Sequence, residues 1–324
     1  MAAALLIAVG CRTTGSGDAK GDDTTEKNTI KEAATFDSDS AYTYVARQVA
    51  MGPRVPGSPA NAECARYIVR ELTRHGADTV TEQRASVTAY NGDVLPINNI
   101  MGRFNTEAPT RLLLLAHYDT RPWADSDPDQ ANHASPVPGA NDGASGVGVL
   151  LEIARQISKT QPKVGVDMLF VDAEDYGQES GFSNHDETWA LGTQYWIEHM
   201  PYAQDALPRY AILLDMVGGI DAKFHREYFS NNSARNIVDK VWGIAARSGY
   251  GSRFVNLDGG AVVDDHVYIN KAGIPAIDII ESKNDVTKSF SPTWHTINDD
   301  LDNIDRASLK AAGQTVLNVI YSEK

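Results

Sequence analysis

Cysteine is scarce in this chain of 324 residues, since only Cys11 and Cys64 are present. No CxxC pair occurs, which excludes cysteine-based zinc fingers and the attachment motif of c-type haem. Basic residues are also few, with 29 Lys and Arg against 43 Asp and Glu and a formal net charge of -14. This balance argues against binding to nucleic acid or to anionic lipid, which basic surfaces attract. The acidic groups could instead attract a cation, either a metal ion or an ammonium group of a substrate.

The apolar stretch of residues 1–10 is much shorter than the roughly 20 residues that a membrane-spanning helix needs. An apolar segment that ends at Gly10 before Cys11 resembles the processing signal of a bacterial lipoprotein, although no Lys or Arg precedes it. The next segment is rich in Thr, Gly, Asp and Lys without apolar periodicity, which is typical of a flexible tether. We therefore expect a lipoprotein-type signal over residues 1–11, a tether over 12–35 and one folded domain over 36–324, exported to the periplasm or tethered to the membrane of a bacterium.

Short, uninterrupted apolar runs alternate with helical patterns in most of the chain. Runs of this kind indicate strands that are buried on both faces of a mostly parallel sheet. Before them, residues 79–89 and 94–103 alternate in polarity and are expected to pair across the turn Asn91-Gly92. The pattern predicts an α/β fold with three layers, helix–sheet–helix, around a central mixed, mostly parallel sheet. The buried strands are expected at 111–116, 166–171, 210–214 and 275–280, and the helices at 58–75, 143–157, 189–199, 233–248 and 306–322.

Polar side chains follow three of these apolar strands directly. His117 and Asp119 come after the first strand, Glu174 and Asp175 after the second, and Asp215 after the third. Ligands of open parallel sheets bind at the carboxyl ends of the strands, so these side chains should converge on one crevice.

Two further segments add chemistry to this crevice. Asp142 lies in the small-residue loop of residues 139–146, where a carboxylate would repel phosphate and favour a metal ion. His295 follows a proline-containing loop near the end of the chain. Histidine and carboxylates on separate loops suit zinc, and no HExxH helix is present. Five other histidines are expected at the surface: His75, His133, His185, His199 and His225.

Several motifs, taken together, identify a family. The chain resembles the zinc aminopeptidase superfamily, and within it the glutaminyl cyclase branch, especially the bacterial type. The resemblance covers nearly all of residues 36–324 and implies a three-layer α/β fold. The motifs that carry it are HYDT at 117–120, NDGASG at 141–146, AEDYG at 173–177, LLDMVGG at 213–219 and WHT at 294–296, with GPRVPGSPAN at 52–61 and GTQYW at 192–196.

The resemblance implies one zinc ion and a reaction on peptides or proteins that begin with Gln. Such enzymes convert the N-terminal Gln to pyroglutamate and release ammonia. By position, Asp142, Asp175 and His295 match the three zinc ligands of the cyclases. Asp175 stands where the animal enzymes carry Glu, so the ligand type is kept with one methylene fewer.

The resemblance also assigns the groups around the zinc ligands. Glu174 matches the carboxylate that shuttles the proton, and Asp215 and Asp264 match the acidic residues of the adjoining hydrogen-bond network. Trp294 matches an aromatic wall of the substrate pocket, and Asp278 occupies a position that is His in animal enzymes.

Two other functions stay open. A two-zinc aminopeptidase of the same superfamily would use His117 and Asp215 for a second ion, with Asp142 bridging the two. A non-catalytic binding domain on this fold is the other alternative. Asp119 is expected to orient a side chain of the metal site, or else to cap a turn.

Some residues have no assigned role in the predicted site. Cys64 is expected to be a small buried apolar residue, and Tyr195 and Trp196 are expected in the core. Trp123 and Trp189 could border the cleft, but the sequence does not say on which side they lie.

Overall fold

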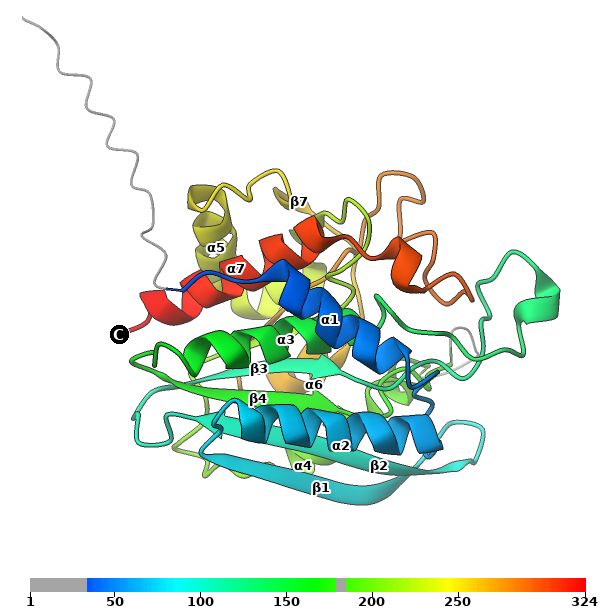
Figure 1. Ribbon diagram of the computed structural model, residues 1–324, viewed down its shortest axis with the longest axis horizontal. Helices are drawn as coiled ribbons and strands as arrows, with labels where there is room; N and C mark the ends of the chain where they lie inside the picture. The colour runs from blue at the N-terminus through cyan, green and yellow to red at the C-terminus, as the bar shows by residue number, and fades with distance from the viewer. Residues whose placement is uncertain (1–33, 179–184) are drawn as a thin grey trace, which may run out of the picture.

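Six strands form the central sheet of the computed structural model, which describes residues 34–178 and 185–324 (Figure 1). Their order is β1-β2-β4-β3-β5-β8. Strands β4, β3, β5 and β8 are parallel to one another, and β2 pairs antiparallel with both of its neighbours, β1 and β4. The predicted mixed, mostly parallel sheet is therefore confirmed. Its strands are β1 (Thr79–Thr88), β2 (Val94–Phe104), β3 (Arg111–His117), β4 (Gly165–Val171), β5 (Ala211–Leu214) and β8 (Ala276–Ile279), and a separate pair is formed by β6 (Phe224–Arg226) and β7 (Phe254–Asp258).

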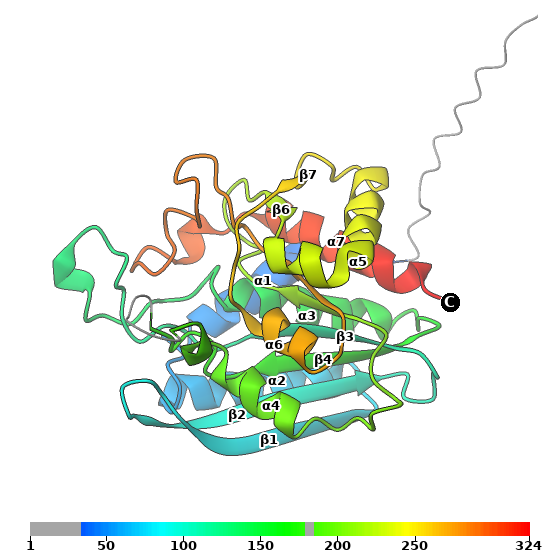
Figure 2. The ribbon, with the colours of Figure 1, turned by 180° about the vertical axis from the view of Figure 1, so that it is seen from behind.

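Helices cover both faces of the sheet, so the three predicted layers are present. Figure 1 shows α1, α2, α3 and α7 in front of the sheet, and Figure 2 shows α4 and α6 on the opposite face. Side chains alternate between the layers, since Leu112 and Leu114 belong to one buried cluster and Leu113 and Leu115 to the other. The helices are α1 (Ser38–Val49), α2 (Pro59–Arg74), α3 (Ala144–Ile157), α4 (Leu191–Glu198), α5 (Tyr228–Arg247), α6 (Asp265–Lys271) and α7 (Arg306–Ser322), with short 3-10 turns η1 (Gln130–Asn132), η2 (His185–Thr188) and η3 (Leu301–Asn303).

Helix α2 begins, and the chain turns between β1 and β2, where the sequence predicted. The Ser58 side chain accepts a hydrogen bond from the Asn61 N–H at the start of α2, whose first residue is proline. The turn between β1 and β2 contains Gly92 at φ 89°, a left-handed conformation that glycine adopts without strain.

Other helix limits differ from the predictions because carboxylate caps determine them. α5 begins at Tyr228 rather than at 233, since the Glu227 carboxylate accepts the N–H groups of Phe229 and Ser230. Helices α1 and α6 were not predicted; Asp37 caps the first and Asp264 caps the second. α6 has only 7 residues, too few for an apolar period to be visible in the sequence.

Two histidines expected at the surface are buried, so that prediction was wrong for them. His75 lies between helices α1 and α2, where its Nε2 is 2.8 Å from the Tyr44 hydroxyl, and His225 lies in β6. His199 is exposed and His133 is half-buried, whereas the side chain of His185 lies outside the described part of the chain. The expected burial of Cys64 and Trp196 is confirmed.

The expectations for the N-terminal signal and for most of the tether fall on residues 1–33, which lie outside the described residues. Phe36 is buried, and its N–H donates to the Gln314 side chain on α7. Within residues 34–178 and 185–324, no helix has the length and apolar character that crossing a membrane requires.

A glycine brings the start of α3 close to the sheet. A Cβ atom on Gly146 would overlap the carbonyl oxygen of Leu214 at the end of β5 and would lie 3.0 Å from the Ala116 Cβ on β3. This close approach places the loop before α3 directly above the carboxyl ends of the two strands.

Replacement of Gly146 by alanine should therefore destabilise the protein, because a backbone carbonyl cannot move aside as a flexible side chain can. We expect a loss of about 1–3 kcal/mol in the free energy of unfolding, as for other overpacked positions. Urea denaturation measures the change. The matched control is Gly243→Ala in α5, where the added Cβ meets only the Arg247 side chain and alanine favours the helix by about 1 kcal/mol. Equal stability of the two variants would contradict the packing argument.

Candidate active site

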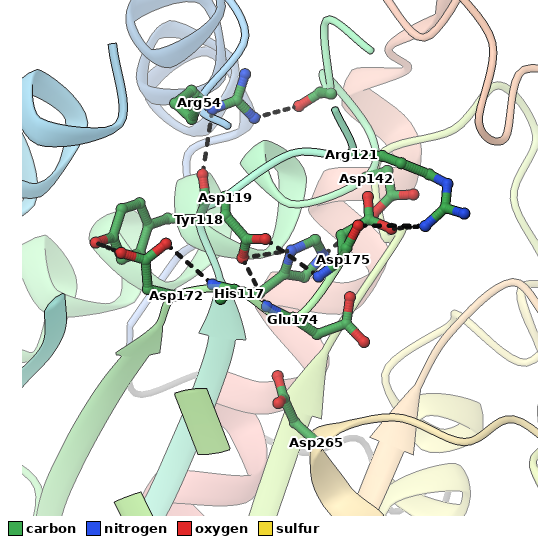
Figure 3. Close-up of polar contacts among 12 residues, drawn as sticks. Arg54, His117, Tyr118, Asp119, Arg121, Asp142, Asp172, Glu174, Asp175 and Asp265 are labelled. Atoms are coloured by element: carbon green, nitrogen blue, oxygen red, sulfur yellow. Dashed lines mark hydrogen bonds and ion pairs between the residues drawn. The ribbon is translucent and has the colours of Figure 1, made fainter. Parts of the chain in front are cut away.

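The carboxyl ends of β3, β4 and β5 bring the predicted site residues together. Asp142, Asp175 and His295 each offer a ligand atom, and these atoms lie within 4.8 Å of one another. The His295 Nε2 is 3.1 Å from the Asp175 Oδ1 and 3.6 Å from the Asp142 Oδ2. All three side chains are buried. The structure thus gathers the three predicted zinc ligands from three separate loops (Figure 3 shows two of them).

The hydrogen bonding of this trio fits a bound metal ion. Among the described residues, neither carboxylate oxygen of Asp175 accepts a hydrogen bond. Burial and the nearby charge of Asp142 raise the pKa of Asp175, so a cation would relieve an unfavourable arrangement. Two carboxylates and one imidazole are a donor set that suits zinc.

The loop that carries Asp142 is held by a buried carboxylate and a buried guanidinium. Asp299 accepts the backbone N–H groups of Asn141 and Asp142 at 2.8 and 3.0 Å. Arg54 donates to the carbonyl oxygens of Gly139 and Tyr118, which ties the loop to the end of β3 (Figure 3). The sequence predicted neither role. Arg54 was noted only as a member of the motif at 52–61, and Asp299 follows His295 in a segment to which no role was assigned.

A second carboxylate holds the loop after β4 in the same way. Asp119 accepts the backbone N–H groups of Glu174 and Asp175, both at 3.1 Å (Figure 3). The preceding residue, Ala173, has φ 53°, a conformation that turns the chain sharply at the strand end. Asp119 also lies 3.5 Å from the His117 Nδ1. Asp119 therefore contacts the side chain of His117 and the backbone of Glu174 and Asp175.

A second group of ligand atoms adjoins the first. The His117 Nε2 lies 3.1 Å from Asp142 Oδ1 and 3.1 Å from Asp215 Oδ1. These three residues also form a cluster with metal-ligand spacing. The geometry therefore keeps open the alternative in which Asp142 bridges two ions.

A cavity of about 230 Å³ opens above these groups. Its floor carries the acidic side chains and His295, while its walls are aromatic and aliphatic. Trp294 forms part of the wall as predicted, with the Phe290 ring centroid 4.7 Å from its own. Trp189, which the sequence could not assign to a side, lines the cavity and stacks on His295 with centroids 6.1 Å apart. The other lining residues are Asp142, Glu174, Asp175, Asp215, Met216, Ala261, Val262, Val263, Asp264 and Ile280.

Three acids of the cavity have pKa values that favour proton exchange. Burial and the charge of Asp264 raise the pKa of Glu174 well above its usual range. Burial raises the pKa of Asp215 to about 6, even with His117 hydrogen-bonded to it. Burial, together with the charge of Asp215, raises the pKa of Asp264 to about 7. Carboxyl groups with a pKa of about 6 to 7, such as Asp215 and Asp264, can both accept and return a proton near neutral pH.

A buried pair that the sequence did not reveal supports the acidic side of the cavity. The His266 Nε2 lies 3.1 Å from the Glu227 Oε2, and the His266 Nδ1 lies 3.9 Å from Asp278 Oδ2. Glu227 also accepts the N–H of Val262, a wall residue of the cavity. Asp264 and Asp278 thus adjoin a histidine that sits on α6, the short helix with no visible apolar period.

Several solved structures resemble this chain over about nine tenths of its length. The crystal structure of Tannerella forsythia glutaminyl cyclase is 50% identical, covers 90% of this chain and 100% of that chain, and has a TM-score of 0.85. The glutaminyl cyclase of Bacteroides thetaiotaomicron, bound to N-acetylhistamine, is 49% identical over 90% of this chain and 99% of its own, with a TM-score of 0.86. A leucine aminopeptidase precursor from Bacteroides thetaiotaomicron VPI-5482 is 48% identical, covers 91% and 100% of the two chains, and has a TM-score of 0.85.

The family model of the M28 peptidases matches residues 99–320, a segment that contains the gathered side chains from His117 to His295. The match and the solved structures confirm the resemblance to bacterial glutaminyl cyclases of the zinc aminopeptidase-like superfamily. The chain belongs to peptidase family M28.

Proposed function

We propose that this chain is a zinc-dependent glutaminyl-peptide cyclotransferase that acts on peptides or proteins with an N-terminal Gln. The main support is the small cavity in which Glu174 lies beside three buried metal-ligand candidates, beneath the rings of Trp189 and Trp294. The sequence identity of 49–50% to two bacterial glutaminyl cyclases, over 90% of this chain, also supports the proposal.

The reaction forms one C–N bond and breaks another. The α-amine of the N-terminal Gln attacks its own side-chain amide carbon, the five-membered ring closes, and ammonia leaves. Asp142, Asp175 and His295 would hold one zinc ion, which when bound supplies Lewis-acid polarisation of that amide carbonyl. The acidic floor of the cavity attracts the ammonium form of the substrate before it reacts.

Glu174 moves the proton. In its ionised form it accepts a proton from the α-nitrogen, and it then returns that proton to the nitrogen that leaves as ammonia. Asp215 and Asp264 line the same cavity, and burial together with the charge of Asp264 raises the pKa of Glu174, which favours the protonated form that the return step needs. Trp189, Trp294 and Phe290 line the cavity, and their rings leave less room for water, which favours ring closure over hydrolysis.

Glu174→Gln should retain the fold and the metal but lose most of the turnover. The amide has the size of the carboxylate but cannot accept the proton, so we expect kcat to fall by about 10²- to 10⁴-fold. Ammonia release from a Gln-aminoacyl substrate measures the rate. The control is Glu198→Gln at the exposed end of α4, which should leave the rate unchanged. A rate near that of the unaltered protein would remove Glu174 from the mechanism.

A two-zinc aminopeptidase is the second candidate function. It is favoured by one observation, the cluster of His117, Asp142 and Asp215 that lies next to the first trio and shares Asp142 with it. In that enzyme the second ion would activate water, which would then attack the peptide bond.

Substrate choice and metal content separate the two candidates. The purified protein is offered Gln-aminoacyl and Leu-aminoacyl fluorogenic substrates in parallel, and zinc per chain is measured after dialysis. For a cyclotransferase we expect ring closure with ammonia release, no Leu hydrolysis and one zinc ion per chain. Leu hydrolysis with two zinc ions per chain would refute the cyclotransferase and establish the aminopeptidase.

A further inference from the structure

The segment after β3 leaves the body of the protein as a long projecting loop, residues 121–137, which carries η1 at its tip (Figures 1 and 2). Its base is closed by backbone hydrogen bonds, from the Val137 N–H to the Arg121 carbonyl at 3.1 Å and from the Ala124 N–H to the Ser135 carbonyl at 2.8 Å. The Ser126 N–H donates to the His295 carbonyl at 3.2 Å. The base of this loop therefore rests on the segment that carries a predicted metal ligand.

A charged pair lies at this base. The Arg121 guanidinium donates two hydrogen bonds to the Asp125 carboxylate, at 2.7 and 2.5 Å. The Arg121 side chain is only 1% exposed, and that of Asp125 is 23% exposed. A buried guanidinium is costly unless its donors are satisfied, and this two-point contact is the geometry in which arginine binds carboxylate most strongly.

Each partner of the pair contacts a different metal-ligand candidate. The Arg121 Nη1 donates to the Asp175 carbonyl at 3.3 Å and lies 3.6 Å from the Asp175 Oδ1 (Figure 3). The Asp125 Oδ1 lies 3.5 Å from the His295 Nδ1, which makes no hydrogen bond with any described residue. His295 therefore has one ring nitrogen towards Asp125 and the other towards Asp142 and Asp175.

This is the arrangement that orients a metal-binding imidazole. A histidine that binds a metal usually donates its other ring N–H to a carboxylate, which selects the tautomer and holds the ring plane. Asp125 is suited to accept it, because its Oδ1 faces the His295 Nδ1 at 3.5 Å and the two hydrogen bonds from Arg121 hold its carboxylate in place.

The same arginine also touches the wall of the cavity. Its guanidinium carbon lies 5.0 Å from the ring centroid of Trp189, and that indole stacks on His295 with an angle of 16° between the planes. A Cβ atom on Gly177 would overlap this indole, and the Gly177 carbonyl accepts a hydrogen bond from Arg121 at 3.1 Å. Asp125 thus faces one edge of the His295 ring, and the indoles of Trp189 and Trp294 stack on that ring.

We propose that Arg121 and Asp125 are positioning residues, which hold His295 and Asp175 in the orientation that binds the metal ion. The proposal rests on the metal site of the proposed function, but not on the reaction that takes place there. Asp125 sets the imidazole tautomer, and Arg121 fixes both Asp125 and the backbone of Asp175.

Zinc affinity in the absence of substrate tests the proposal. The metal-free protein and its variants are titrated with zinc against a competing chelator, and thermal unfolding of each metal-free variant checks the fold. We expect Asp125→Ala to weaken zinc binding by about 10- to 100-fold, the usual effect of removing such a partner. Asp125→Asn should lose less, because its amide oxygen can still accept the His295 Nδ1–H. Asp129→Asn, an exposed change in the same loop, should bind zinc like the unaltered protein.

Zinc affinity of Asp125→Ala within twofold of the unaltered protein would overturn the proposal, as would the absence of zinc binding in the unaltered protein. If Asp125→Ala does not fold, folded Asp125→Asn replaces it in the test. Weaker zinc binding by Asp125→Asn than by Asp129→Asn then supports the proposal, and equal zinc affinity of these two variants overturns it. If the unaltered protein binds zinc but does not cyclise Gln, the proposed function fails while the ranking of the variants still decides the positioning role.

Discussion

Buried carboxylates that accept pairs of backbone N–H groups hold the loops that carry the metal-ligand candidates. Asp119 binds the N–H groups of Glu174 and Asp175, and Asp299 binds those of Asn141 and Asp142. These four bonds help to hold the side-chain carboxylates of the two loops together against their mutual repulsion. The site therefore depends on acids that bind backbone and thereby place other acids around the metal position.

The concentration of negative charge has a chemical consequence. Burial raises the pKa of Asp215, Asp264 and Asp299 to between about 6 and about 7. Such groups are relieved either by a cation or by protons. Metal-ligand candidates and carboxyl groups with raised pKa values line the same cavity. The overall acidity of the chain is thus partly concentrated in the cavity where the proposed substrate, with its ammonium group, would bind.

The sheet and the strand-end residues could be predicted because continuous apolar runs and polar residues at strand ends follow directly from burial on both faces. The side-chain contacts around the strand-end residues could not be predicted from the sequence. Asp125 lies in a loop without periodicity, and the side on which Trp189 lies depends on the space that Gly177 leaves. His266 sits on a helix of 7 residues. His75 was misplaced because its buried partner, Tyr44, comes from another helix.

The three metal-ligand candidates stand far apart along the chain, and this has a consequence for the order of events during folding. Along the chain, the segment with His295 follows those with Asp142 and Asp175, and Asp299, which supports the loop of Asp142, follows His295. Contacts between such distant segments form only after the chain between them has collapsed. The complete arrangement of the three metal-ligand candidates therefore forms only when the segment of residues 295–299 has docked against the loops that precede it in the chain.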